Sequence, residues 1–186
     1  MLTTWLNTQP NLDYQPNDGS FPTDGPGMVS GLFKMKFSTR IDTDLAAERL
    51  FETIGNFDAL ERMLIGRGAS VSRIDPSLEP GIGMGWNIGF DWRGKPRKLR
   101  LAVTRFDRPE QMTMAGRSDA LELGIIATVV ALSRARSRLI FETEVKPRNM
   151  KARLMLQTAK LGKSQLDRRY QRRIEEFVQQ MSGSPA

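Results

Sequence analysis

The sequence contains no cysteine and no histidine. The lack of cysteine excludes disulfides, thiolate nucleophiles, iron–sulfur clusters and Cys-ligated zinc. The lack of histidine excludes imidazole bases, the Ser-His-Asp and Cys-His constellations, and every His-ligated metal site. Acid–base chemistry is therefore left to Asp, Glu, Lys and only two Tyr. We expect no metal site and no cofactor, we assign no catalytic residue, and binding is favoured over catalysis.

Long apolar runs are missing as well, since no stretch approaches the 18 or more apolar residues of a membrane span. No Lys or Arg precedes Lys34, and no apolar segment of signal-peptide length is present near the N-terminus. A cytoplasmic location is the default expectation, with no positive signal behind it. The 186 residues suit one domain of ordinary size with a substantial apolar core.

Residues 1–30 differ in composition from the rest of the chain, with four Pro, three Gly, three Asp and no basic residue. Such a segment buries too little apolar surface to order itself, which favours a flexible tail. Two alternatives stay open: an arm that docks on the domain through scattered aromatic residues, and a true start at Met28 or Met35. The predicted organisation is a tail over 1–30, one domain over 31–181 and a disordered end over 182–186.

From Lys34 onward the hydrophobic pattern becomes regular. Alternation over 36–41 predicts a strand, and helical spacing after it predicts two short helices within 47–64. Residues 69–147 read as successive strands joined by tight turns, which indicates an antiparallel meander with one solvated face. After Pro147, apolar residues recur at mostly three- to five-residue steps and predict one long helix, which Gly162 interrupts and allows to kink.

The clearest period of two lies between residues 84 and 92, where every second residue is large and apolar. A solid core is the favoured interpretation, and the alternative is the wall of an apolar pocket facing the long helix. The preceding segment 81–85 is rich in glycine, but it leads into a strand and not into a helix. A turn is therefore favoured there over a phosphate-binding loop.

The formal net charge of +7 is concentrated in one segment. Residues 146–181 hold ten Lys or Arg and three acids, so their net charge equals that of the whole chain. Arg168, Arg169, Arg172 and Arg173 form a positive strip on adjacent turns. A solvated helix face, partly paired with acids three or four residues away, is favoured. The alternative is contact with phosphates of an anionic membrane or RNA, although no nucleic-acid-reading motif accompanies the strip.

Paired carboxylates that would indicate acid–base catalysis find little support, because no acid falls on an apolar strand face. The polar residues predicted to reach an interior cavity are Thr39, Arg105 and Thr143. Alternation places Arg105 on the strand face of Leu101 and Val103, where it could anchor an anionic headgroup. A position on the rim of that strand is the favoured alternative.

The order of these elements resembles the SRPBCC superfamily, which includes START, polyketide cyclase/dehydrase and birch-pollen-allergen-like proteins. Three features carry the resemblance: residues 37–44 running into 47–51, the segment 80–86 that opens the third strand, and the terminal helix. The likeness covers about 35–181 and leaves the tail outside. These motifs are diffuse and indicate the fold more than the activity.

The resemblance implies an α+β helix-grip fold, in which a curved antiparallel sheet of about seven strands wraps a long C-terminal helix and encloses a cavity. It implies a carrier or sensor of a small hydrophobic or lipid-like molecule. The first alternative is a cyclase- or dehydratase-type enzyme that uses the cavity as a template, and the second is binding of anionic lipid or RNA through the basic helix. Ligand identity and oligomeric state are not predicted. The predicted ligand-binding residues are Met84, Trp86, Ile88, Phe90, Trp92, Leu101, Val103, Arg105, Met112, Met114, Leu154 and Leu161.

Overall fold

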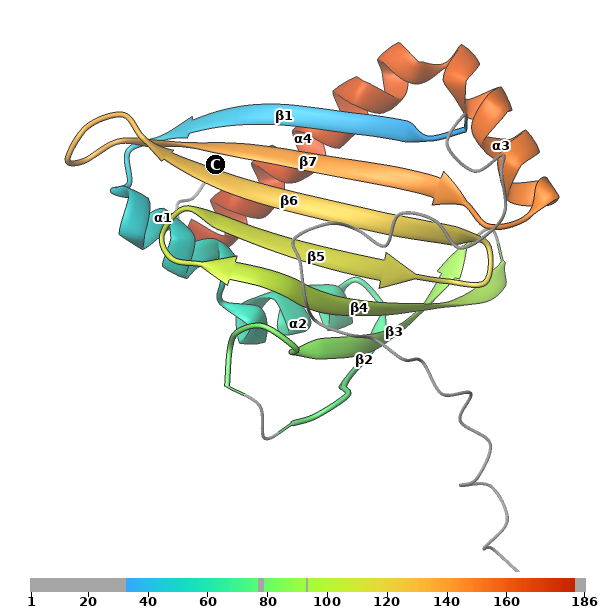
Figure 1. Ribbon diagram of the computed structural model, residues 1–186, viewed down its shortest axis with the longest axis horizontal. Helices are drawn as coiled ribbons and strands as arrows, with labels where there is room; N and C mark the ends of the chain where they lie inside the picture. The colour runs from blue at the N-terminus through green and yellow to red at the C-terminus, as the bar shows by residue number, and fades with distance from the viewer. Residues whose placement is uncertain (1–32, 77–78, 93, 183–186) are drawn as a thin grey trace, which may run out of the picture.

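The computed structural model describes residues 33–76, 79–92 and 94–182, with Trp92 and Ser182 described by their backbone alone. The tail expected over 1–30 lies outside these residues, and so does the end expected over 182–186 except for Ser182, which is the last residue of a helix. The described chain forms one seven-stranded sheet and four helices (Figure 1). The strands are β1 (Met35–Thr43), β2 (Ser70–Arg73), β3 (Gly85–Trp92), β4 (Lys95–Asp107), β5 (Gln111–Arg117), β6 (Leu121–Ala131) and β7 (Ser137–Pro147).

The sheet confirms the predicted antiparallel meander. Its strand order is β1-β7-β6-β5-β4-β3-β2, so the strands from β2 to β7 lie beside their neighbours in sequence. The first strand closes the order by pairing with β7 over its full length, from Met35 opposite Val145 to Thr43 opposite Ser137. Alternate side chains of every strand therefore share one inner face, which carries the apolar residues.

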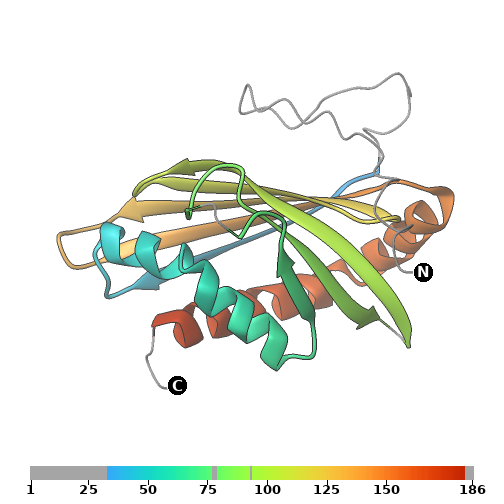
Figure 2. The same ribbon diagram turned by 90° about the horizontal axis from the view of Figure 1, so that it is seen from below.

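Two short helices follow β1, as the sequence predicts. They are α1 (Ala47–Ile54) and α2 (Phe57–Gly66), and the Asn56 side chain caps α2 by accepting a 3.0 Å hydrogen bond from the Ala59 amide. Both helices lie on the same side of the sheet as the C-terminal helix (Figure 2). Their rings enter the core, since Phe57 lies 5.0 Å from Trp86 and Phe51 lies 5.2 Å from Phe106 between centroids.

The segment predicted as one long C-terminal helix is divided at Gly162, where the sequence allowed a kink. The first part is α3 (Met150–Leu161), and the second is α4 (Lys163–Ser182). The Asn149 side chain caps α3 by accepting a 2.9 Å hydrogen bond from the Ala152 amide. The two helices run in different directions, with α4 behind the sheet and α3 at the end of the sheet away from α1 (Figure 1).

Candidate functional site

The inner face of the sheet is covered at one end and open at the other. Along β3 the exposed fraction rises at successive inward positions: Met84, just before the strand, is 1% exposed, Trp86 is 2%, Ile88 is 8% and Phe90 is 37%. The buried end lies against α1 and α2, whose rings contact Trp86 and Phe106. The strand therefore runs from a packed core into a region where apolar side chains remain accessible.

The same change occurs on β6 and β7. The inward residues Val129 and Ala127 of β6 are buried, and the next inward residue, Ile125, is only half-buried. On β7 the buried Leu139 is followed by Phe141 and Thr143, which are both half-buried. The transition thus occurs on β3 and on the adjacent strands β6 and β7, which β4 and β5 separate from β3.

Helix α4 lies over this open part and adds one polar group to it. The Tyr170 ring stacks on Phe37 of β1 with the centroids 5.2 Å apart. Its hydroxyl oxygen lies 2.7 Å from Thr143 Oγ1 and 3.4 Å from the Phe141 carbonyl oxygen, which accepts a hydrogen bond from it. Burial raises the pKa of Tyr170, the hydrogen bond with Thr143 lowers it, and the charge of Glu142 raises it, with a net increase. The phenol is therefore neutral at physiological pH.

A second polar cluster fixes α2 on the sheet at the buried end. Trp86 Nε1 and Arg73 Nε each donate a 2.6 Å hydrogen bond to Glu61 Oε1. Arg73 also forms an ion pair with Asp58, and its hydrogen bond to Glu61 is the main cause that raises its pKa. The carboxylate of Glu61 is thus held by two donors. This cluster supports the core, and it gives the indole of Trp86 a fixed place there.

The structure divides the predicted ligand-binding residues into groups. Phe90 lies at the open end, and the side chain of Trp92 lies outside the described part of the chain. Leu154 and Leu161 are 66% and 91% exposed and do not face the sheet, because α3 turns its other side inward. Seven residues are 0–8% exposed and belong to the packed core: Met84, Trp86, Ile88, Leu101, Val103, Met112 and Met114.

The structure corrects the predicted orientation of Arg105. A β-bulge between Val103 and Arg105 shifts the register of β4 against β5. Beyond the bulge Phe106 takes the inward position, and Arg105 points away from the core. Its guanidinium donates a 2.5 Å hydrogen bond to Asp107 and a 2.6 Å hydrogen bond to Gln111 on the outer face. Arg105 is therefore not placed to anchor a headgroup on the inner face.

The remaining predicted polar residues lie on the sheet, and the arginine strip lies on α4. Thr39 is buried on the inner face, and Thr143 is the partner of the Tyr170 hydroxyl. Sequence reasoning missed Glu61 and Tyr170 as interacting groups. The strip is exposed on α4, and Arg172 pairs with Glu176 at 3.8 Å. This is the arrangement expected of a solvated helix face. The residues of the strip are Arg168, Arg169, Arg172 and Arg173.

A concavity of about 560 Å³ lies beside β1 and β7 and shares Phe37 and Thr143 with the inner-face site. Its charged residues pair with one another, as Lys36 does with Glu144 at 3.1 Å and Lys163 with Asp167 at 2.7 Å. Burial raises the pKa of Glu144, but hydrogen bonds from lysines outweigh it, so that pKa lies below its usual value. The concavity therefore combines paired charges with apolar residues such as Phe37 and Ile126. It is lined by Lys36, Phe37, Ser38, Gly124, Ile126, Glu142, Thr143, Glu144, Lys163 and Asp167.

Two further features are absent from the part of the chain that the structure describes. No helix there is both long and apolar enough to cross a membrane. No group of three or more acidic residues there is arranged to hold a metal ion.

Comparison of the sequence with models of protein families and with curated proteins found no match. Solved structures do match in shape. TTHA0849 from Thermus thermophilus has a TM-score of 0.60 at 9% identity, covering 82% of this chain and all of that one (100%). The Zhui aromatase/cyclase from Streptomyces sp. R1128 has a TM-score of 0.56 at 9% identity, covering 81% and 92%. Norcoclaurine synthase from Thalictrum flavum, in complex with dopamine and hydroxybenzaldehyde, has a TM-score of 0.55 at 10% identity, covering 76% and 87%.

The protein therefore has the helix-grip fold, in which a curved antiparallel sheet packs around a C-terminal helix. The resemblance to the SRPBCC superfamily that the sequence indicated is confirmed at the level of the fold. Identities of 9–10% show the fold alone, so the function has to be argued from the residues of this chain.

Proposed function

We propose that the protein binds a small hydrophobic molecule between the open part of the inner sheet face and α4. The rise in exposure along β3, from 1% at Met84 to 37% at Phe90, carries this proposal. Among the strands α4 packs mainly on β1, so it leaves the far end of β3 uncovered. Apolar side chains that stay accessible on a concave face are the usual lining of a ligand site.

The Tyr170–Thr143 pair supports a ligand with one polar group. It is a hydroxyl pair on a mostly apolar surface, and a few placed polar groups orient a ligand in such sites. Zhui is described as an aromatase/cyclase, and the norcoclaurine synthase structure holds two small aromatic molecules. At least one protein of this fold therefore holds small aromatic molecules.

Binding as a carrier or sensor is the first form of this proposal. The chain lacks His and Cys, and Glu61 is held by Trp86 and Arg73, which leaves it no free role as a base. The neutral phenol of Tyr170 favours one second candidate, a cyclase-type enzyme in which this hydroxyl donates a hydrogen bond to a substrate carbonyl. Turnover that is lost in Tyr170→Phe while binding persists would distinguish the enzyme from the carrier.

The test compares two neighbouring isoleucines of β6. Ile125 faces inward opposite Thr143, and Ile126 faces outward opposite Glu142, where it lines the concavity beside β1 and β7. Both are half-buried. We expect Ile125→Trp to fill the site and weaken binding of the uncharged probe N-phenyl-1-naphthylamine by about tenfold or more, and Ile126→Trp to leave binding unchanged. Native mass spectrometry of the purified full chain should also show a retained small molecule.

The opposite pattern would contradict the proposal. Loss of probe binding in Ile126→Trp alone would place the ligand in the concavity beside β1. No saturable probe binding by the wild-type chain, together with no retained molecule, would remove the binding function. Circular dichroism of both variants verifies that they are folded, so that a loss of binding reports the site.

A further inference from the structure

Helix α3 is apolar on two opposite faces. Its buried side carries Ala152 and Leu156, which are 3% and 7% exposed. On the other side Met150, Leu154 and Leu161 are 73%, 66% and 91% exposed. A surface helix normally presents polar or charged residues to solvent, so this helix has an apolar stripe without a partner among the described residues.

Helical geometry places the three exposed residues in one narrow stripe. At 3.6 residues per turn, positions 150, 154 and 161 lie within an arc of about 40°. The buried residues Ala152 and Leu156 lie on the far side of the helix axis. The stripe therefore spans α3 from residue 150 to residue 161, with the exposed polar residues Gln157 and Thr158 between Leu154 and Leu161.

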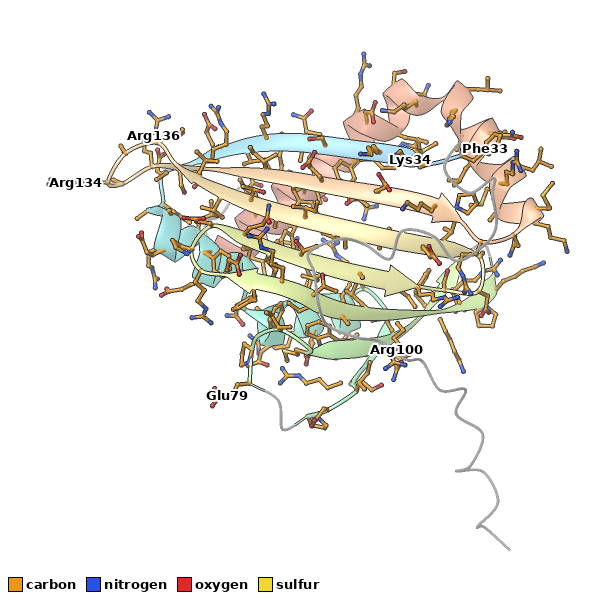
Figure 3. All side chains as sticks on the ribbon, viewed as in Figure 1. Phe33, Lys34, Glu79, Arg100, Arg134 and Arg136 are labelled. Carbon is orange, nitrogen blue, oxygen red and sulfur yellow. The ribbon has the colours of Figure 1, made fainter. Side chains whose placement is uncertain are left out.

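The charges around the stripe are all positive. Helix α3 contains Lys151, Arg153 and Lys160 and no acid. The two lysines are exposed and lie on opposite flanks of the stripe. The guanidinium of Arg153 covers the ring of Phe33 at 3.5 Å from its centroid, which anchors the start of the described chain beside α3 (Figure 3).

The positive charge continues beyond Gly162 into α4. The exposed strip of Arg168, Arg169, Arg172 and Arg173 follows on that helix. Helix α4 also carries three acids, Asp167, Glu175 and Glu176, so of these two helices only α3 is free of acidic residues. Apolar anchors with flanking lysines and no acid, as on α3, are the pattern of helices that lie in the interface of an anionic bilayer.

We propose that α3 docks on an anionic lipid bilayer, with the stripe of Met150, Leu154 and Leu161 inserted at the headgroup boundary. The flanking lysines then lie at the level of the lipid phosphates. A second copy of this chain is a poorer occupant, because a symmetric contact would set these cations against each other. Nucleic acid fits the cations but leaves the apolar stripe exposed.

The test uses the full chain and sedimentation with vesicles of phosphatidylcholine, with and without phosphatidylserine. We expect binding only to the vesicles that contain phosphatidylserine, and binding that weakens as salt rises. The double variant L154S/L161S should bind about tenfold more weakly or worse, since it removes two inserted leucines. The charge-reversal variant K151E/K160E should lose binding, and K151R/K160R should keep it.

The matched control is I65S/L132S, which removes two exposed apolar residues away from α3. Ile65 and Leu132 are 54% and 43% exposed, and Leu132 lies at the opposite end of the sheet, next to the turn that carries Arg134 and Arg136 (Figure 3). We expect this control to bind vesicles as the wild type does.

Three results would overturn the proposal. The first is a wild-type chain that ignores vesicles containing phosphatidylserine, whether or not it binds RNA in the same buffer. The second is equal binding to neutral vesicles. The third is wild-type binding by L154S/L161S. The exposed positions of the substituted residues make misfolding a poor explanation of any loss, and thermal unfolding of each variant checks this directly.

Discussion

Replacement of Phe90 by alanine tests the idea that the open end of the inner face holds the ligand. Phe90 is the last inward residue that the structure describes on β3, and it is 37% exposed. The substitution removes apolar surface that a bound molecule would cover. It leaves the buried core residues Met84 and Trp86 unchanged.

The magnitude follows from the exposed area. A phenylalanine side chain offers roughly 200 Å² of surface, so the 37% that stays exposed amounts to about 70 Å². Covering that area with a ligand is worth about 2 kcal/mol at ~25 cal/mol per Å², which is an affinity change of about 20- to 30-fold. The buried remainder of the ring costs about 3 kcal/mol of folding stability when it is removed.

The assay is a fluorescence titration with N-phenyl-1-naphthylamine at low temperature, where the less stable variant stays folded. Leu132→Ala is the control, because Leu132 is 43% exposed but lies at the other end of the sheet. We expect Phe90→Ala to weaken binding by about 20-fold and Leu132→Ala to have no effect. A change below about threefold in folded Phe90→Ala would refute the assignment of this end of the sheet as the site.

Two further predictions concern the polar pairs. Glu61→Gln removes the charged acceptor that holds Trp86 and Arg73. It should lower the free energy of unfolding, measured in urea, by about 1.5–3 kcal/mol. An unchanged midpoint of the urea unfolding curve would contradict the role of this cluster. Tyr170→Phe keeps the ring stack and leaves Thr143 without that partner, and it should cost about 1 kcal/mol at neutral pH. The folded pKa of Tyr170 is raised, so its contribution to stability is complete below the unfolded value of about 10 and is lost as pH rises through the folded value. The stability difference between wild type and Tyr170→Phe should therefore shrink in alkaline buffer, and a constant or growing difference would contradict the raised pKa.

Most of the fold could be predicted from the sequence because its elements are periodic. The alternation over 84–92 reflects a strand with one buried face, and the apolar residues spaced three to five apart after Pro147 reflect a helical segment with one buried face. Periodicity fails where the backbone departs from it. Residues Leu101, Val103 and Arg105 continue a period of two in the sequence, and only the register against β5 reveals the bulge that turns the arginine outward.

The candidate site was harder to predict for a different reason. Helix α3 carries apolar residues on both faces, so spacing alone does not tell the buried Leu156 from the exposed Leu154 and Leu161. The Tyr170–Thr143 pair joins residues 27 positions apart, and the Trp86–Glu61 pair joins residues 25 positions apart. Tertiary packing sets such contacts. The only local signal was a tyrosine hydroxyl within an otherwise apolar helix stripe.

The most direct test of hydrophobic-ligand binding is an isoleucine-methyl NMR titration of the full chain with N-phenyl-1-naphthylamine. The inward Ile125 lies opposite Thr143, and Ile174 lies one helical turn after Tyr170 on α4, whereas Ile126 and Ile140 face the other side of the sheet. We predict saturable shifts of the Ile125 and Ile174 methyl signals, with those of Ile126 and Ile140 unchanged. Shifts confined to Ile126 and Ile140, or no saturable shift at any of the four, would contradict the account.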